Sequence, residues 1–420
     1  MTYFREFRVN WQTLLATFVG IATGQALSHY TMSLFAPELI SEFGWSKAEF
    51  ALVSALPLVT ALVTPLAGRF TDRFGARLAA SIGFGAISLG FFAMSAMQGN
   101  LIVFFAIWLF QHVFGVMTTS LVFTRVIVGR FDKARGSALS ALMLGPPISG
   151  SVVAPILGWV IASEGWRSGF LFLAALSALG GLICIVFMGR SSRKAGQPAE
   201  AKSLKLTRAE LMAVVKSRVF ILIVAGMALI NIAQPFAASQ LKLIVLAKGV
   251  PDQIGTWMVS LYAVGVIVGR IIFGVALDRV PANVVALCAL SLPTAGFLIL
   301  ASPSTAVALL VIGILTIGIA QGAEGDIGGY LVSRHFDLKN YALIFSFVKS
   351  ALDGGGAIGA LILSYSLSAS TTPATPDGSY VPFLLLCAAT TLIGAILFFM
   401  TGRDVTHAVA DDAVIASEAS

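Results

Sequence analysis

Twelve apolar runs follow one another along the chain, and they constrain its fold more than any other feature. A helix needs roughly 20 mostly apolar residues to cross the hydrocarbon core of a bilayer. It also satisfies its own backbone hydrogen bonds, which lipid cannot satisfy. The sequence therefore predicts an all-α membrane protein with twelve transmembrane helices, at residues 12–35, 48–67, 78–97, 101–127, 138–161, 168–189, 219–246, 256–277, 283–302, 306–332, 342–367 and 381–401.

Charged residues are scarce and unevenly distributed. Only 11% of the 420 residues are charged, against about a quarter in a soluble domain. The net charge of +7 does not indicate a nucleic-acid partner, because 20 of the 27 Lys and Arg residues fall in segments on one side of the predicted membrane. The opposite side holds four, which are Lys47, Arg167, Lys242 and Lys248. Basic residues mark the cytoplasmic side, so we expect both termini there and the protein in the inner (plasma) membrane.

One long charged stretch interrupts the apolar runs after span six. The sequence predicts a cytoplasmic linker at 190–217 between an N-terminal six-helix bundle, 1–189, and a C-terminal six-helix bundle, 218–402. Residues 403–420 are polar and acidic, and we expect them to form a disordered cytoplasmic tail.

The two halves repeat each other. GRFTDRFGAR (Gly68–Arg77) follows span two, and GVALDRV (Gly274–Val280) follows span eight; both contain GxxxDR, 206 residues apart. RFDKARGSA and HFDLKNYAL repeat at a shift of 205 after spans four and ten. Such repeats are the usual construction of secondary carriers, which bind substrate near the bilayer midplane between two pseudo-symmetric bundles.

On these motifs the chain resembles the major facilitator superfamily over essentially its full length. The gating motif that the resemblance identifies comprises Gly68, Asp72, Arg73, Gly75 and Arg77, with a degenerate second copy at Asp278 and Arg279, which Val280 and Pro281 follow. Asp72 and Arg73 are expected at a helix end, where charge-assisted hydrogen bonds to a neighbouring helix would latch the inner face.

Five ionisable residues lie inside the predicted spans of the second half. They are Arg270 in span eight, Glu324 and Asp326 in span ten, and Lys349 and Asp353 in span eleven. An ionised side chain at mid-membrane costs about 2.5 to 3.5 kcal/mol on insertion scales, so each such position is a functional hypothesis. The arginine offers a planar fork to a carboxylate and the lysine a mobile point charge, which together indicate an anion site.

Span eleven carries its polar residues on one face. Ser346, Lys349, Ser350 and Asp353 recur at helical spacing and share that face with Gly356 and Ala357. The face is both polar and narrow, and it can line a transport pathway.

An arginine in span eight and a lysine in span eleven resemble the oxalate:formate antiporters and the monocarboxylate porters. The resemblance implies that Arg270 and Lys349 bind a substrate carboxylate, and it places His29 where monocarboxylate porters carry a functional lysine in span one. Those porters also carry an aspartate four residues before the arginine, but here that position is Val266. The coupling acid must therefore come from elsewhere, or protons are not coupled.

Glu324, Asp326 and Asp353 are the candidates for proton coupling, since a carboxyl in a cavity can bind and release a proton during transport. Glu324 and Asp326 lie about 200° apart around a helix, so both cannot face one cavity. Alternatives remain for each cation: Lys349 and Asp353 can form a self-neutralised pair, and Arg270 can bridge to either acid of span ten. Asn231, Gln234 and Gln240 in span seven are interpreted as polar side chains that join helices, with Gln234 also a candidate for substrate contact.

The sequence contains no GxxxxGK[ST] loop, no HExxH pair and no Cys/His cluster. It therefore predicts no enzyme activity, cofactor or metal site. We expect a monomeric transporter that takes up a small organic carboxylate, a monocarboxylate or aromatic acid, with a proton. A carboxylate:carboxylate antiporter, an exporter of hydrophobic or cationic compounds and a non-transporting membrane sensor remain alternatives.

Overall fold

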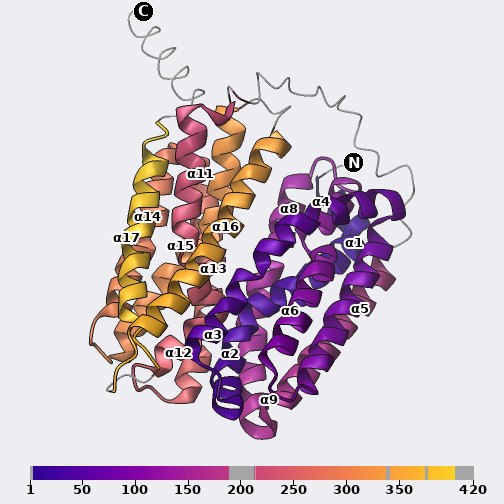
Figure 1. Ribbon diagram of the computed structural model, residues 1–420. Helices are drawn as coiled ribbons and strands as arrows, with labels where there is room; N and C mark the ends of the chain where they lie inside the picture. Colours follow the sequence, from indigo (N-terminus) through magenta and orange to yellow (C-terminus); the bar gives the residue numbers. More distant parts are fainter. Residues whose placement is uncertain (1–2, 189–211, 213, 337–340, 374–376, 403–420) are drawn as a thin grey trace, which may run out of the picture. The chain divides into compact units, whose positions relative to one another are not determined.

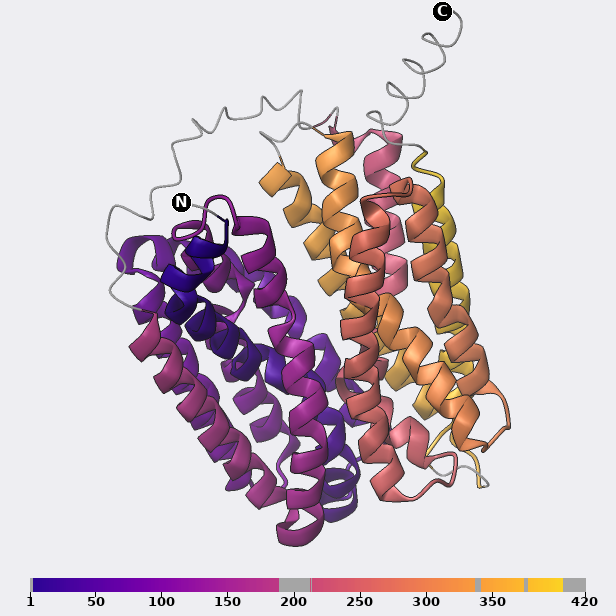
Figure 2. The same cartoon turned by 180° about the vertical axis from the view of Figure 1, so that it is seen from behind.

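The computed structural model describes residues 3–188, 212, 214–336, 341–373 and 377–402 (Figures 1 and 2). The predicted tail and most of the predicted linker lie outside these residues. Within them the secondary structure elements are helices: α1 (Tyr3–Thr23), α2 (Gln25–Phe43), α3 (Lys47–Ala51), η1 (Leu52–Ala55), α4 (Pro57–Phe74), α5 (Ala76–Ser95), α6 (Leu101–Gly115), η2 (Val116–Thr118), α7 (Ser120–Val128), α8 (Arg135–Met143), α9 (Gly145–Phe187), α11 (Arg218–Asn231), η3 (Phe236–Gln240), α12 (Leu241–Leu246), α13 (Asp252–Leu277), α14 (Ala282–Ala301), α15 (Val307–His335), α16 (Tyr341–Ala369) and α17 (Val381–Phe399).

The apolar runs form helices as predicted, and in the described residues ten helical stretches are long and apolar enough to cross a membrane. Two features account for ten instead of twelve. The region of span one, divided at Gly24 into α1 and α2, is not among the ten, and spans five and six form one stretch, 135–187. Helix α9 turns at Gly165, whose φ of +84° favours glycine. The all-α membrane fold is confirmed.

The chain divides into two compact units. Unit 1 comprises Met1–Ala199 and Phe236–Ala263, and unit 2 comprises Glu200–Pro235 and Val264–Ser420. The boundary between Pro235 and Phe236 falls at the start of η3, just after α11 ends. Residues 236–263, which the sequence assigns to the second bundle, therefore pack with the first-half helices.

Unit 1 is built around α9, which packs against α1, α2 and α5. Small residues allow the close approach. A Cβ on Gly180 would lie 2.0 Å from Oγ1 of Thr23, so only glycine fits there. One turn earlier, the Ser177 hydroxyl donates to the carbonyl oxygen of Thr23 at 3.0 Å. This hydrogen bond satisfies a buried serine without a second polar side chain.

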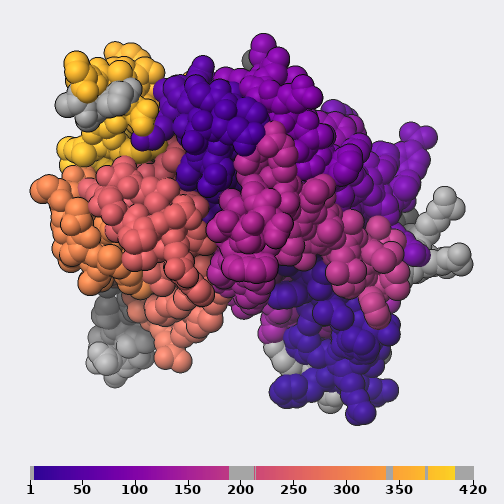
Figure 3. Space-filling model, turned by 90° about the horizontal axis from the view of Figure 1, so that it is seen from below, coloured from indigo at the N-terminus to yellow at the C-terminus, as the bar shows by residue number. Residues whose placement is uncertain are grey.

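Residues 236–263, here called the 236–263 hairpin, contact α2, α3, η1 and α9 of unit 1. Figure 3 views the end of the molecule that carries α12. The hydroxyl oxygens of Ser54 and Ser239 are 2.8 Å apart, and the Ser260 hydroxyl donates to the carbonyl oxygen of Ser151 at 2.5 Å. Helix α9 lies so close to the hairpin that a Cβ on Gly158 would be 2.3 Å from Thr256. These contacts join residues of opposite sequence halves.

The assignment of Lys242 to an outer loop is wrong. Lys242 lies in α12 with only 1% of its side chain exposed, and its ammonium group is 2.8 Å from the Asp252 carboxylate at the start of α13. A buried ammonium group needs such a partner. The pair closes the 236–263 hairpin on itself, ten residues apart, which no local spacing rule predicts.

Unit 2 packs α14 against α15 and α17, and α11 against α16 and α17. Helices α13 and α15 touch through their backbones, because a Cβ on Gly322 would lie 2.2 Å from the carbonyl oxygen of Val266. Helices α11 and α16 do the same at Gly355, whose Cβ would be 2.2 Å from the carbonyl oxygen of Ala228. These two crossings set the positions of the charged side chains.

Candidate functional site

The crossing of α13 and α15 brings Arg270 to Asp326. The ideal Cβ position of Gly322 in α15 is 2.8 Å from the backbone nitrogen of Arg270 in α13. Asp326 lies one helical turn after Gly322. The guanidinium Nε of Arg270 is 3.2 Å from Oδ2 of Asp326. The side chains are 22% and 42% exposed, so the pair is partly solvated. Arg270 therefore bridges to an acid of span ten, which was one of the alternatives, and that acid is Asp326.

Lys349 and Asp353 form the second pair. They are one turn apart on α16, and Nζ of Lys349 is 2.6 Å from Oδ1 of Asp353. The lysine side chain is 55% exposed and the aspartate only 12%. Ser346 and Ser350 are exposed on the same stretch, whereas Gly356 is buried against Gln234 of span seven. The polar face of α16 is thus open at Lys349 and closes two turns later.

Glu324 lies in a different environment from Asp326. Its side chain is 3% exposed. Its carboxylate accepts hydrogen bonds from the amide of Asn231 on α11 and from the amide of Gln321 at 2.9 Å. The two acids point to different helices, as their angular separation predicted, and Asn231 joins two helices, as expected. Among the described residues Glu324 has no ion-pair partner, which distinguishes it from the two paired aspartates.

Gln234 lies between α11 and η3, directly after the turn formed by Ile232 and Ala233. Its amide oxygen is buried and accepts no hydrogen bond from any described residue. The nearest wall is Gly356 of α16, whose ideal Cβ position is 3.4 Å from that oxygen. Gln234 therefore belongs to the same side of unit 2 as the polar face of α16.

His29 lies in α2 and belongs to unit 1, and Arg270 and Lys349 belong to unit 2. Its ring contacts that of Tyr30 edge-on, with centroids 5.0 Å apart. Four residues before His29, α2 begins at Gln25, whose backbone N–H donates to the hydroxyl of Thr118 at 2.9 Å. Span four is interrupted at the same point, since η2 ends at Thr118. The breaks of spans one and four thus face each other, which the sequence did not predict.

The first copy of the gating motif forms a clasp inside unit 1. Nη1 of Arg125 in α7 is 3.2 Å from Oδ1 of Asp72 and donates to the carbonyl oxygen of Gly68 at 3.1 Å. The guanidinium lies on Gly68, since Nη2 is 3.5 Å from its ideal Cβ position. Arg73 instead lies exposed over the ring of Phe74, at 5.2 Å from the centroid. Asp72 therefore forms the clasp with Arg125, a residue of α7 that lies outside the motif.

The motif also makes the corner between α4 and α5 with one residue. Gly75 has φ +90°, a conformation that L-residues rarely adopt, and Arg77 is the second residue of α5. The second copy differs at the corner, where Pro281 has φ −52°. Asp278 and Arg279 are exposed and form no ion pair with a described residue.

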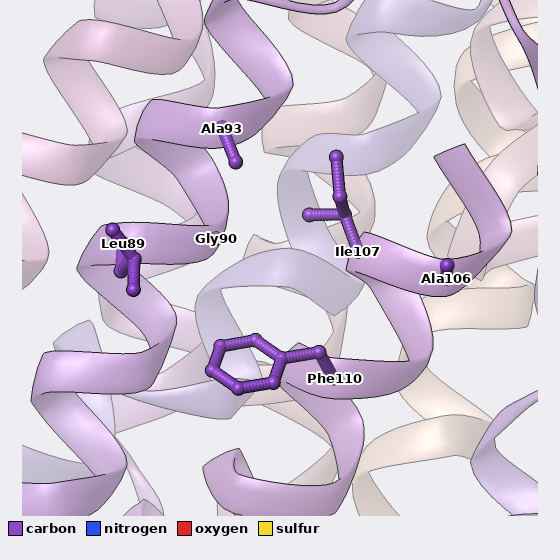
Figure 4. Close-up of a pocket in the computed structure, with 6 residues that line it drawn as sticks. All are labelled: Leu89, Gly90, Ala93, Ala106, Ile107 and Phe110. Atoms are coloured by element: carbon purple, nitrogen blue, oxygen red, sulfur yellow. The ribbon is translucent and has the colours of Figure 1, made fainter. Parts of the chain in front are cut away.

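An apolar pocket lies between α5 and α6 (Figure 4). It has a volume of about 290 Å³. The residues that line it are Leu89, Gly90, Ala93, Ala106, Ile107 and Phe110. None of these side chains can hydrogen-bond a carboxylate, so the pocket does not suit an anionic substrate. Within the described part of the chain, no three His, Cys, Asp or Glu side chains gather as a metal site would require.

Sequence comparison shows the family, and structure comparison shows the fold. Residues 16–251, more than half of the chain, match the Major Facilitator Superfamily. The nucleoside transporter NupG is structurally similar, with a TM-score of 0.72 and 16% identity over 93% of this chain and 98% of that one. The D-xylose-proton symporter gives 0.72 and 14% over 96% and 99%, and the peptide transporter POT gives 0.71 and 15% over 93% of each. Comparison with curated protein sequences gives no match. The chain belongs to the major facilitator superfamily and is a membrane transporter, not an enzyme.

Proposed function

We propose that this transporter takes up a small organic carboxylate, a monocarboxylate or aromatic acid, together with a proton, by alternating access between its two halves. The observation that carries the proposal is that each of the two candidate substrate-binding cations is held by an aspartate, Arg270 by Asp326 and Lys349 by Asp353. A substrate carboxylate has the chemistry to replace either aspartate.

The energies allow this replacement. Partly exposed ion pairs contribute only about 0 to 1 kcal/mol, and Arg270–Asp326 is such a pair, with 22% and 42% exposure. A ligand that binds with a Kd of about 1 mM gains about 4 kcal/mol. A carboxylate bound by both a planar guanidinium and a mobile ammonium can therefore open both pairs and still bind. His29 and Gln234 are the further substrate contacts of this proposal.

Glu324 is the proposed proton carrier. A buried carboxylate without a cation is costly to keep ionised, and the described donors to Glu324 are neutral amides. Binding of the substrate carboxylate to Arg270 and Lys349 releases Asp326 and Asp353 from these cations. The two aspartates are therefore the other proposed proton-coupling residues.

We infer that both termini lie on the cytoplasmic side of the inner membrane, because the basic residues concentrate on that side, and that the protein acts as a monomer.

Uptake into proteoliposomes tests the function. A panel of radiolabelled mono- and dicarboxylates is offered with and without an inward proton gradient, to wild type and to Glu324→Gln, with exposed Glu164→Gln as the matched control. We expect one class of carboxylate to accumulate with the gradient. Glu324→Gln should lose accumulation but keep carboxylate exchange, because a permanently neutral side chain still allows the empty or loaded carrier to turn.

Three outcomes contradict the proposal. Accumulation that ignores the proton gradient but requires carboxylate inside the vesicles would identify an antiporter. Transport of hydrophobic cations by the vesicles, with no uptake of any carboxylate, would identify an exporter. No accumulation of any compound under any gradient would identify a membrane protein that does not transport these acids.

A further inference from the structure

Span seven is interrupted next to the buried carboxyl of Glu324. Helix α11 ends at Asn231, Ile232 and Ala233 form a turn, and helical backbone resumes at Gln234 and Pro235, before η3 begins at Phe236. The N–H groups of Ile232 and Ala233 donate to carbonyl oxygens three residues earlier, at 3.3 Å, instead of four residues earlier as in an α-helix. Pro235 has no N–H to donate to a helical hydrogen bond. We call this two-residue turn, Ile232 and Ala233, the span-seven break.

Asn231 connects this break to Glu324. It is 2% exposed, and its Nδ2 donates both to the carbonyl oxygen of Met227, at 2.9 Å, and to the carboxylate of Glu324. An amide nitrogen has two hydrogens, so both are used. The side chain is therefore fixed in orientation, with one hydrogen bond into its own helix and one to α15.

Helix α16 holds the other side of the same break. A Cβ on Gly359 would lie 2.0 Å from the carbonyl oxygen of Ile232, so the two backbones are in direct contact. The end of α11 is thus restrained by α16 through shape and by α15 through one hydrogen bond. Only the second restraint depends on a titratable group.

Protonation changes that one hydrogen bond. A hydrogen bond to a carboxylate is roughly twice as strong as one between neutral groups. If Oε2 of Glu324 is protonated, its O–H can donate to the amide oxygen of Gln321 once that amide group turns over. The turn breaks one described hydrogen bond, from Nε2 of Gln321 to Glu324. Asn231 cannot turn in the same way without placing its oxygen against the carbonyl oxygen of Met227. Protonation therefore weakens the restraint on α11 and leaves the rest of unit 2 in place.

We propose that Asn231 is a positioning residue that transmits the protonation state of Glu324 to the span-seven break, and so links proton binding to the movement of span seven. This inference rests on the proposed proton-coupled function. The charged groups around Glu324 are accounted for: Lys349 of α16 acts on it electrostatically and is held by Asp353. On the third neighbouring helix, α13, Arg270 is held by Asp326.

The pH dependence of uptake tests the inference. Asn231→Leu removes the donor at nearly constant size, and Asn283→Leu is the matched control, because Asn283 is also buried in unit 2 but donates only to the carbonyl oxygen of Phe399. Loss of a donor to the carboxylate favours the protonated form. We expect the pH of half-maximal uptake to rise by about one unit, a tenfold change in proton concentration, while KM for the carboxylate stays within about twofold. Asn231→Asp, which keeps the size, should also move it upward through like-charge repulsion.

The conformational half of the inference has its own readout. In Ala233→Cys, maleimide labelling of the break is measured at high and low pH relative to Glu164→Cys, a cysteine at an exposed position beside the turn of α9 at Gly165. The relative rate should rise at low pH, and Asn231→Leu should abolish this change. An unmoved pH profile in both Asn231 variants, or an equal shift in Asn283→Leu, would overturn the inference. Carboxylate uptake by wild type without any pH dependence would overturn the proposed function instead.

Discussion

Arg270 reaches Asp326 because a glycine lies between their helices. Gly322, one turn before Asp326, has its ideal Cβ position 2.2 Å from the carbonyl oxygen of Val266, one turn before Arg270. The backbones of α13 and α15 are therefore in contact, and the two side chains meet at 3.2 Å. The pairing of these charges follows from the helix crossing, not from their reach alone.

Gly322→Ala should separate these helices. Its methyl group would overlap backbone atoms, which cannot rotate away, and overpacking of this kind costs about 1 to 3 kcal/mol. We expect the melting temperature of the purified protein to fall by roughly 3 to 10 °C, with loss of uptake. Gly325→Ala is the matched control, because no atom lies within 4 Å of its Cβ position. Equal melting temperatures for the two variants would contradict the crossing.

Ser54→Cys/Ser239→Cys should lock the 236–263 hairpin to the first-half helices. The two hydroxyl oxygens are 2.8 Å apart, so sulfur atoms in their places need only a small further approach to form a bond of about 2.05 Å. In the proposed alternating access the hairpin moves against the first-half helices, so oxidation should stop transport and a reductant should restore it. The single variants serve as controls. Full transport by the cross-linked protein, with the disulfide shown on a gel, would contradict this role for the hairpin.

Glu6 should make the stability of unit 1 depend on pH. Its carboxylate accepts hydrogen bonds from the N–H groups of Ala134 at 3.0 Å and of Asp132 and Lys133 at 3.2 Å. The N–H of Ala134, followed by those of the other two residues and opposed by desolvation, holds the pKa of Glu6 below its ordinary value of 4.5. A lowered pKa in the folded state means that the contribution is present above pH 4.5 and is lost as the pH falls through the folded-state value.

Glu6→Gln should therefore lower the melting temperature by a few degrees at neutral pH and by less below pH 4.5. Thermal unfolding of wild type and variant across this pH range measures the difference, and exposed Glu164→Gln is the control. A melting-temperature difference that is constant with pH would show that the hydrogen-bonded carboxylate is not the cause.

Much of the fold is predictable from local patterns in the sequence. The apolar runs form helices because each must satisfy its own backbone in lipid. The pairing of Lys349 with Asp353 follows from their i,i+4 spacing, and the divergence of Glu324 from Asp326 follows from the angle between helical positions. These relations depend on one helix at a time.

The rest depends on contacts between helices. Asn231 and Glu324 are 93 residues apart, and no pattern in either helix shows that they meet. The same holds for Asp72 and Arg125, although an arginine inside a predicted span was a signal that a partner was needed. Lys242 was misplaced because its burial is made possible by Asp252, across a turn. Interruptions such as Gly24 are equally hidden, since glycine is tolerated inside membrane helices.

Uptake of the identified carboxylate by Arg270→Gln and Lys349→Gln tests the central claim most directly. Arg334→Gln is the matched control, because Arg334 is exposed near the end of α15 and stacks on Tyr330. If the two cations bind the substrate carboxylate, each of the first two variants should raise KM at least tenfold or abolish uptake, since a hydrogen bond to a charged group contributes about 1.5 to 3 kcal/mol. The control should transport like wild type. Normal uptake by both folded variants would show that Arg270–Asp326 and Lys349–Asp353 are structural pairs and that the anion site lies elsewhere.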